Sequence, residues 1–280
     1  MRTVRTEDIT QAVKKMCIEA NLYLADDMKK ALYNACDNEE NVLGKKILGQ
    51  LKENLDIAGN EQIPICQDTG MAVVFVKIGQ DVHIEGGSFS AAINEGVRQG
   101  YEEGYLRKSV VGDPIERVNT KDNTPAVIHY EVVPGEEFEI TLAPKGFGSE
   151  NMSVLKMLKP ADGIEGVKQV ILDAVAAAGP NACPPVVIGV GIGGTFEKCA
   201  LLAKKALTRK LDSESSIPWV RELEREMLDK INALGVGPGG LGGSVTALGL
   251  NVETYPTHIA GLPVAVNICC HVNRHITTKI

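Results

Sequence analysis

The fold of this chain is decided by the stretch Pro185-Val186-Val187-Ile188-Gly189-Val190-Gly191-Ile192-Gly193-Gly194. Its first half predicts a short β-branched strand over 185–189, and a helix is predicted over 195–209. The glycines between them fit G-x-G-x-x-G, the pattern of a dinucleotide-binding turn, which needs an acid at the end of a second strand roughly 20 residues further on. Asp212 has that spacing but lies in a segment that leads into another helix. We therefore interpret the glycines as allowing a helix N-terminus and its amides to approach another group closely, for example an anion.

Hydrophobic patterns on either side of this stretch predict a mixed α/β chain. Helices are expected within residues 1–60, where Leu43, Ile47, Leu48, Leu51 and Leu55 recur at steps of three and four. Further helices are predicted over 91–105, 167–178 and 219–234, and strands over 71–79, 126–133, 138–143 and 262–270. Residues 134–137 are expected to connect two of these strands as a hairpin. Without a repeat or a low-complexity linker, we interpret residues 1–280 as one catalytic domain, in which a helical segment (1–60) precedes a mixed sheet with flanking helices (61–280).

Composition excludes several classes of function. The 280 residues include 29 Lys+Arg and 36 Asp+Glu, for a net charge of −7, and this acidic balance argues against non-specific nucleic-acid binding. No apolar run approaches the roughly 18 residues that span a bilayer. The start of the chain turns acidic at once and lacks the apolar region of a signal peptide. We expect a cytoplasmic protein that binds neither nucleic acid nor membrane.

The seven cysteines fall into two groups. Cys17, Cys36 and Cys199 lie in predicted helices, where small side chains of the core are expected, whereas Cys66, Cys183 and the pair Cys269-Cys270 lie at junctions between elements. Adjacent strand residues point to opposite faces, so the pair supplies one ligand to a shared metal. Three separated thiolates suit an iron–sulfur cluster with one iron left without a protein ligand, or a zinc with an open position. Burial of each cysteine as an ordinary thiol is the competing interpretation.

Two further features are open to more than one interpretation. The glycine-rich segment 237–244 lacks the Gly-Lys-Ser/Thr ending of a phosphate-binding loop, so we interpret it as a flexible connector. His258, His271 and His275 lie near the C-terminal end with Arg274 and Lys279. This local positive cluster fits either an anionic ligand or a solvated face of the protein.

Four motifs carry a resemblance to a known family. They are Ile65-Cys66-Gln67-Asp68-Thr69-Gly70, Lys145-Gly146-Phe147-Gly148-Ser149-Glu150-Asn151, Cys183-Pro184-Pro185 leading to Gly191-Ile192-Gly193-Gly194, and Cys270-His271-Val272-Asn273-Arg274-His275. In this order, over almost the whole chain, they resemble the iron–sulfur hydro-lyases, namely the class I fumarases and L-tartrate dehydratases. The resemblance covers only the α portion of those enzymes. Their β portion, fused in some members and a separate subunit in others, is not in this sequence.

The resemblance implies a specific set of site residues. An oxygen-sensitive [4Fe-4S] cluster would be held by Cys66, Cys183 and Cys270, with Cys269 as the alternative third ligand. Residues that contact substrate carry over to Gln67, Asp68, Arg107, the backbone at Gly148, and His258, which in the family reaches the site from a neighbouring protomer. Asp68 and His258 are the candidate catalytic residues of this chain. We further hypothesise that Asp68 orients Arg107 or the substrate hydroxyl, because a carboxylate beside a dianionic substrate is otherwise repelled.

The function implied is reversible hydration of fumarate to L-malate, a reaction of the tricarboxylic acid cycle, with a small dicarboxylate as substrate. The chain would be the α subunit of an α2β2 enzyme, inactive without a β subunit that supplies the catalytic base. One alternative is the α subunit of an L-tartrate dehydratase, and another is a metal-binding or redox-sensing module without turnover. A nicotinamide-dependent oxidoreductase rests on the glycine pattern alone.

Overall fold

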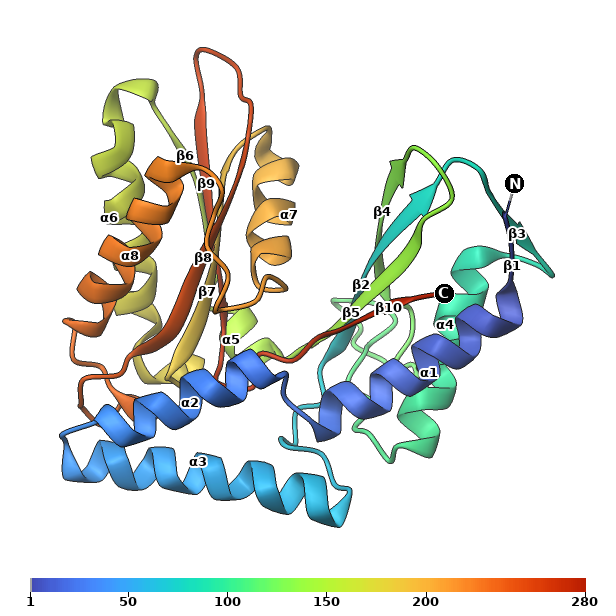
Figure 1. The fold of residues 1–280 in the computed structure, drawn as a ribbon, viewed down its shortest axis with the longest axis horizontal. Coiled ribbons are helices and arrows are strands. Elements are labelled where there is room, and N and C mark those ends of the chain that lie inside the picture. Colours follow the sequence, from blue (N-terminus) through green and yellow to red (C-terminus); the bar gives the residue numbers. More distant parts are fainter. Residues whose placement is uncertain (1) are drawn as a thin grey trace. The chain divides into compact units, whose positions relative to one another are not determined.

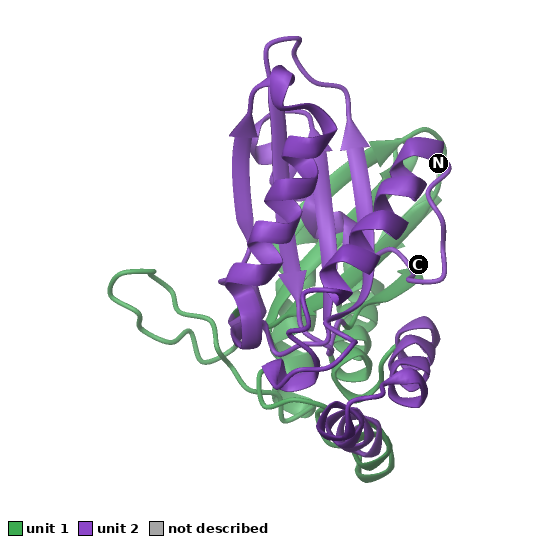
Figure 2. Ribbon diagram, turned by 90° about the vertical axis from the view of Figure 1, so that its left-hand side faces the viewer, with its two compact units in different colours: residues 1–25, 55–147, 274–280 green, residues 26–54, 148–273 purple. Residues whose placement is uncertain are grey.

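The computed structural model describes residues 2–280, which form two compact units, each built of helices and a sheet (Figures 1 and 2). The mixed α/β class expected from the sequence is confirmed. The interpretation of the chain as one catalytic domain stays a prediction. Unit 1 comprises residues 2–25, 55–147 and 274–280, and unit 2 comprises residues 26–54 and 148–273.

Unit 1 contains a four-stranded sheet in the order β10-β5-β2-β4, and a parallel pair of short strands, β1 and β3. Helices α1 and α4 pack against one another, and their apolar side chains share a core with β2 and β5. The elements are β1 (Arg2–Arg5), α1 (Thr6–Leu22), β2 (Met71–Gly79), β3 (Val82–Glu85), α4 (Phe89–Glu103), β4 (Val127–Val133), β5 (Phe138–Lys145) and β10 (Ile276–Lys279). Helix α3 (Val42–Glu61) begins in unit 2 and ends in unit 1.

The hairpin expected at residues 134–137, between the strands now labelled β4 and β5, is wrong. β4 and β5 follow one another in the chain, but β2 lies between them, parallel to β4 (Val74↔Ile128) and antiparallel to β5 (Val74↔Leu142). The physical reason is burial. β2 is almost wholly apolar and largely buried, so it occupies the centre of the sheet, whereas most residues of β4 are exposed or half-buried, as suits an edge.

Unit 2 contains a four-stranded sheet in the order β6-β9-β7-β8, with α6 and α8 packed on one face and α7 on the other (Figure 1). The strands are β6 (Val154–Leu158), β7 (Val186–Gly193), β8 (Ala247–Tyr255) and β9 (Leu262–Cys269). The helices are α2 (Asp26–Asn38), α5 (Phe147–Glu150), α6 (Gly163–Ala178), α7 (Phe196–Ala206) and α8 (Pro218–Asn232), with short 3₁₀ turns η1 (Pro160–Asp162), η2 (Gly179–Ala182) and η3 (Pro238–Gly240).

Gly189, Gly191 and Gly193 of the opening stretch lie inside strand β7, and Gly194 follows it. The strand runs on to Gly193, and a Cβ on Gly191 would lie 2.1 Å from the carbonyl oxygen of Cys199 in α7. At Gly189 the same atom would lie 2.1 Å from the carbonyl oxygen of Ala203. These glycines therefore allow α7 to pack directly on the strand. The interpretation of the glycines as an approach to an anion stays a prediction, whereas the nicotinamide alternative loses the observation on which it rested, because packing on α7 explains Gly189 and Gly191.

Most of the other expected elements are confirmed. Most of the first sixty residues form α1, α2 and α3, and α6 ends at residue 178 as predicted. Helix α8 ends two residues before the predicted 234, and its Leu223, Met227 and Ile231 are buried, whereas Leu234 is exposed beyond the helix. The sequence analysis missed β1, β3, β6, β8 and β10. No helix among residues 2–280 combines the length and the apolar character that crossing a bilayer requires.

Candidate active site

The loop that carries Cys66, Gln67 and Asp68 precedes the central strand of unit 1 and is held by buried side chains. The hydroxyl of Tyr101 lies 2.8 Å from the carbonyl oxygen of Thr69 and 2.9 Å from that of Gly70, and donates to them. Burial raises the pKa of Tyr101, so this hydroxyl remains a donor at neutral pH. Asn123 Nδ2 donates to the same Gly70 oxygen at 3.1 Å. The backbone of the loop is therefore fixed before any ligand binds.

Asp68 is supported by main-chain donors. Its Oδ1 accepts from the N–H of Gly70 and its Oδ2 from the N–H of Phe147, each at 3.0 Å. Its carbonyl oxygen accepts from Nη2 of Arg274, whose Nε donates to Pro144 O at 3.4 Å. Arg274 is 3% exposed, and within residues 2–280 its Nη1 has no hydrogen-bond partner. A buried guanidinium that is capped only by carbonyls thus lies directly behind the Cys66–Asp68 loop, and sequence analysis did not assign it this position.

Arg107 is connected to this loop through its backbone. Thr69 Oγ1 donates to the carbonyl oxygen of Arg107 at 3.0 Å, and the Arg107 residue itself is exposed. Gln67 is also exposed, while Cys66 and Asp68 are half-buried. Unit 1 therefore presents a thiol, an amide, a carboxylate and a guanidinium on two connected loops. The hypothesis that Asp68 orients the Arg107 side chain stays a prediction.

In unit 2, the sheet register brings Cys183 and Cys270 to the same edge. β7 and β9 are antiparallel with Val187 opposite Cys269, so Cys183, just before β7, and Cys270, just after β9, both lie at the edge where β7 begins. The Nδ1 atom of His271 lies 3.2 Å from the carbonyl oxygen of Cys183. This proximity follows from strand pairing, which the spacing of the cysteines in the sequence does not reveal.

Burial separates the cysteines. Cys269 is 3% exposed within β9, whereas Cys270 is half-buried and Cys183 is exposed. Cys17 and Cys199 are fully buried, which confirms their expected place in the core, whereas Cys36 is only half-buried, so its expected place there is wrong. Burial raises the pKa of Cys199 to about 12. These buried thiols stay protonated at neutral pH and are poor metal ligands.

Gly148 lies beside the turn that carries Cys183. A Cβ on Gly148 would have the carbonyl oxygen of Asn181 as its nearest neighbour, at 4.0 Å. In the same short helix, Glu150 forms an ion pair with Lys204 and accepts from Asn267 Nδ2 at 2.8 Å. Helix α5 is thereby anchored to α7 and β9, and the exposed backbone at Gly148 has a fixed position within unit 2.

His258 lies at the opposite edge of the same sheet. It is exposed on the loop between β8 and β9, and its Nδ1 accepts from the N–H of Ala260 at 3.2 Å. That loop lies at the end of the sheet opposite the start of β7 (Figure 1). The eight residues of β9 separate this loop from Cys270, which corresponds to about 26 Å. Within one copy of unit 2, His258 and the Cys183–Cys270 edge are therefore not brought together.

The glycine-rich segment 237–244 is not a flexible connector. It includes the 3₁₀ turn η3 and is held by hydrogen bonds to the side chain of Glu39, a residue that the sequence analysis did not single out. Glu39 is 2% exposed and accepts backbone hydrogen bonds from Ser244 and Val245. Glu39 is one of three acids among residues 37–40, and nothing in the sequence distinguishes it for this contact, which joins residues about 200 positions apart.

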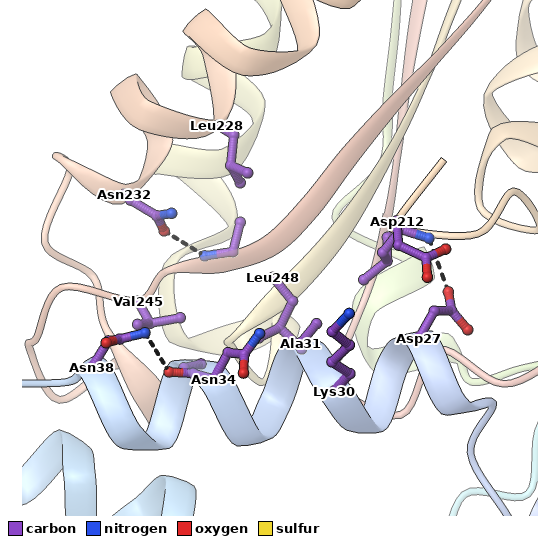
Figure 3. Close-up of a pocket in the computed structure, with 13 residues that line it drawn as sticks. Asp27, Lys30, Ala31, Asn34, Asn38, Asp212, Leu228, Asn232, Val245 and Leu248 are labelled. Carbon is purple, nitrogen blue, oxygen red and sulfur yellow. Dashed lines mark hydrogen bonds between the residues drawn. The ribbon is translucent and has the colours of Figure 1, made fainter. Parts of the chain in front are cut away.

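The predicted cluster ligands do not lie together within either unit. Among residues 2–280, no set of three or more His, Cys, Asp or Glu side chains lies in an arrangement that could hold a metal ion. A groove of about 370 Å³ in unit 2, where Asp27 of α2 lies near Asp212, is lined by none of the predicted site residues (Figure 3). The predicted ligands are divided between the units, with Cys66 in unit 1 and Cys183 and Cys270 in unit 2.

Comparison with known proteins identifies relatives over nearly the whole chain. The model of the family described as fumarate hydratase (Fumerase) matches residues 10–279. A protein of Methanocaldococcus jannaschii with the provisional name L(+)-tartrate dehydratase subunit alpha is 44% identical over 278 residues, which cover 97% of each chain. The L(+)-tartrate dehydratase subunit alpha of Escherichia coli K12 is 30% identical over 276 residues, covering 97% of this chain and 90% of the relative.

Proposed function

This chain belongs to the fumarate hydratase (Fumerase) family, a family of hydro-lyases, and on that premise we propose that it is the α subunit of a two-subunit iron–sulfur enzyme that reversibly hydrates fumarate to L-malate. The observation that carries this proposal is the pairing of β7 with β9, which brings Cys183 and Cys270 to one edge of a sheet and leaves both less buried than Cys269.

The donor set suits a [4Fe-4S] cluster. Cys66, Cys183 and Cys270 would hold it: each lies on a loop, each is exposed or half-buried, and thiolate sulfur is the ligand that such clusters require. When bound through only three protein thiolates, the cluster supplies an iron that acts as a Lewis acid toward the hydroxyl that is added or removed. The family matches and the loop positions of these thiols support this assignment.

Recognition of the substrate would fall to the loops of unit 1. The exposed Arg107 offers two parallel N–H donors to one carboxylate of a dicarboxylate, and Gln67 offers an amide N–H. Asp68 keeps a fixed orientation because both its oxygens accept from main-chain N–H groups, so its remaining lone pairs can accept a proton or a hydrogen bond from the substrate hydroxyl. We assign the base that removes the carbon-bound proton to the β subunit.

We propose that His258 acts in the site of a second copy of this chain. Its Nδ1 accepts from Ala260, so the neutral ring carries its proton on Nε2 and can donate to a ligand. Because about 26 Å of sheet separates it from Cys270 in its own unit, contribution across an α–α interface agrees with the α2β2 assembly expected from the sequence.

Mixing two inactive variants tests whether His258 acts in the site of a second copy of the chain. Cys183→Ser keeps His258 but loses a cluster ligand, and His258→Gln keeps the cluster ligands. Random mixing of the two, each with the β subunit, should restore about a quarter of the wild-type activity, because half of the dimers are mixed and each then has one complete site. If His258 acts within its own chain, no mixed dimer has a complete site and the mixture stays inactive.

The names of the relatives favour a second substrate. Both relatives described above are named as L(+)-tartrate dehydratase α subunits, whereas the family model is described as fumarate hydratase. The deciding experiment is co-expression with a β subunit, anaerobic reconstitution with iron and sulfide, and assay on fumarate, L-malate and L(+)-tartrate.

Each outcome of that assay leads to a different conclusion. We expect about four irons per chain and the highest kcat/KM on fumarate. A higher kcat/KM on tartrate would replace the first assignment with the second. A full cluster without turnover of any of the three would favour a metal-binding or redox-sensing module. A cytoplasmic location and a place in the tricarboxylic acid cycle remain predictions.

A further inference from the structure

A buried carboxylate fastens the glycine-rich loop 237–246. Glu39, just after α2, is 2% exposed, and its Oε1 accepts from the N–H of Asn41 at 2.9 Å. Its Oε2 accepts from the N–H groups of Ser244 at 2.9 Å and Val245 at 3.1 Å. The neighbouring glycine leaves room for this group, because a Cβ on Gly243 would lie 2.8 Å from Oε2. Although burial raises it, these hydrogen bonds leave the pKa of Glu39 below its ordinary value, so the carboxylate is ionised at neutral pH.

The same loop contacts the Cys183 segment on both sides of the cysteine. Before it, Gly240 packs so closely on Pro180 that a Cβ would lie 2.3 Å from the Cβ of the proline. After it, Gly239 N–H donates to Pro184 O at 2.8 Å, and Thr246 O accepts from Val186 N–H at 2.9 Å. Loop 237–246 thus borders the whole turn from residue 180 to residue 186.

Cys183 needs such support because its backbone is in the left-handed region, at φ 53° and ψ 63°. This conformation is unfavourable for a residue with a Cβ and persists only where the surroundings enforce it. Two local hydrogen bonds contribute: Cys183 N–H donates to Pro180 O at 3.1 Å, and the Cys183 carbonyl lies beside His271 Nδ1. Loop 237–246 adds its contacts with Pro180, Pro184 and Val186 to these constraints.

We propose that Glu39 is a positioning residue for Cys183: by anchoring loop 237–246, it holds the Cys183 turn in the left-handed conformation that directs this thiol to its ligand. The inference rests on the proposed function only for the identity of the group that Cys183 binds, the iron–sulfur cluster. The coupling between Glu39 and the Cys183 turn does not depend on it. Glu39 accepts from the main-chain N–H groups of Asn41, Ser244 and Val245, none of which belongs to the Cys183 turn, so its effect on Cys183 is indirect.

Hydrogen exchange on the full-length apo chain, followed by mass spectrometry, tests the coupling without any cluster. Glu39→Gln keeps the size of the side chain but replaces one acceptor oxygen by an NH₂ group that faces main-chain donors. We expect amide exchange in peptides over 237–246 and 179–186 to rise about tenfold, equivalent to about 1.4 kcal/mol, while exchange over 66–70 stays unchanged. Glu40→Gln, at the exposed neighbouring acid, is the matched control and should behave as wild type.

Glu39→Asp keeps the charge and serves as the conservative variant. It should loosen the same two segments by a smaller factor, and it decides the matter if Glu39→Gln does not fold. Faster exchange over 237–246 with wild-type exchange over 179–186 would overturn the proposal, as would uniform loosening of unit 2 in Glu39→Asp.

Iron retention then separates this inference from the proposed function. After anaerobic reconstitution, the Glu39→Gln chain should lose iron in air several-fold faster than the Glu40→Gln chain. If the wild-type chain takes up no iron, the proposed function fails while the exchange result still decides the coupling. Equal loss of iron by the two variants, with wild-type uptake intact, would count against the positioning role.

Discussion

Replacement of Gly191 by Ala tests why strand β7 is rich in glycine. The added Cβ would lie 2.1 Å from Cys199 O, 2.7 Å from Ala203 N and 2.9 Å from Leu202 Cβ, whereas ordinary contacts begin at 3.4 Å. Two of these neighbours are backbone atoms of α7, so helix and strand must separate by about 1.3 Å in a close-packed interior. Overpacking of this kind costs about 1–3 kcal/mol, and the reduced entropy of the unfolded chain returns about 0.4–1 kcal/mol. Because backbone atoms cannot move aside as a side chain can, we expect the upper end of the overpacking cost, and so a net loss of about 2 kcal/mol.

The assay is thermal and urea unfolding of the purified chain, followed by far-UV circular dichroism. For a domain of this size, 2 kcal/mol lowers Tm by about 4–8 °C. Gly249→Ala is the matched control, on the neighbouring strand β8, because its Cβ would meet the Cδ2 end of the flexible Leu211 side chain at 2.7 Å. The control should lose less than about 1 kcal/mol. Equal stability of the two variants would refute the reasoning that α7 packs on bare backbone.

Three further outcomes follow from the site. Asp68→Asn places an NH₂ group against the N–H of Gly70 or Phe147, so we expect at least a hundredfold loss of kcat with unchanged iron content, and full turnover would exclude a role for the carboxylate. Cys270→Ser should abolish iron uptake after reconstitution, whereas Cys269→Ser should retain it; the reverse pattern would make Cys269 the third ligand. The pKa of the buried Cys199 thiol is raised from 9.0 to about 12, so its stabilisation is complete below pH 9 and is lost as pH rises through 12. The urea midpoint of the wild type should therefore fall more steeply over that window than the midpoint of Cys199→Ala. Equal falls in the two proteins would contradict this prediction.

Local patterns predicted much of the fold because they report short-range physics. β2 was predicted with its bounds from one apolar run, and α6 from an alanine-rich stretch that ends at Gly179. Strand partners were not predictable in this way. The hairpin expected between β4 and β5 is interrupted by β2, since the most apolar strand gains most from a central position.

The sequence by itself determined the family and the residues that carry its chemistry, because motifs of six or seven residues around Cys66, Gly148, Cys183 and Cys270 retain chemical identity without reference to any partner. Only the tertiary structure decided which of these residues are neighbours. The antiparallel register of β7 and β9 brings Cys183 to the edge where Cys270 lies and leaves His258 at the other. Burial then distinguishes Cys269 from the less buried Cys270. The carboxylate of Glu39 binds the glycine-rich loop although about 200 residues separate the two in the chain. Such relations depend on which surfaces exclude water together, and that is a property of the packed chain rather than of any segment.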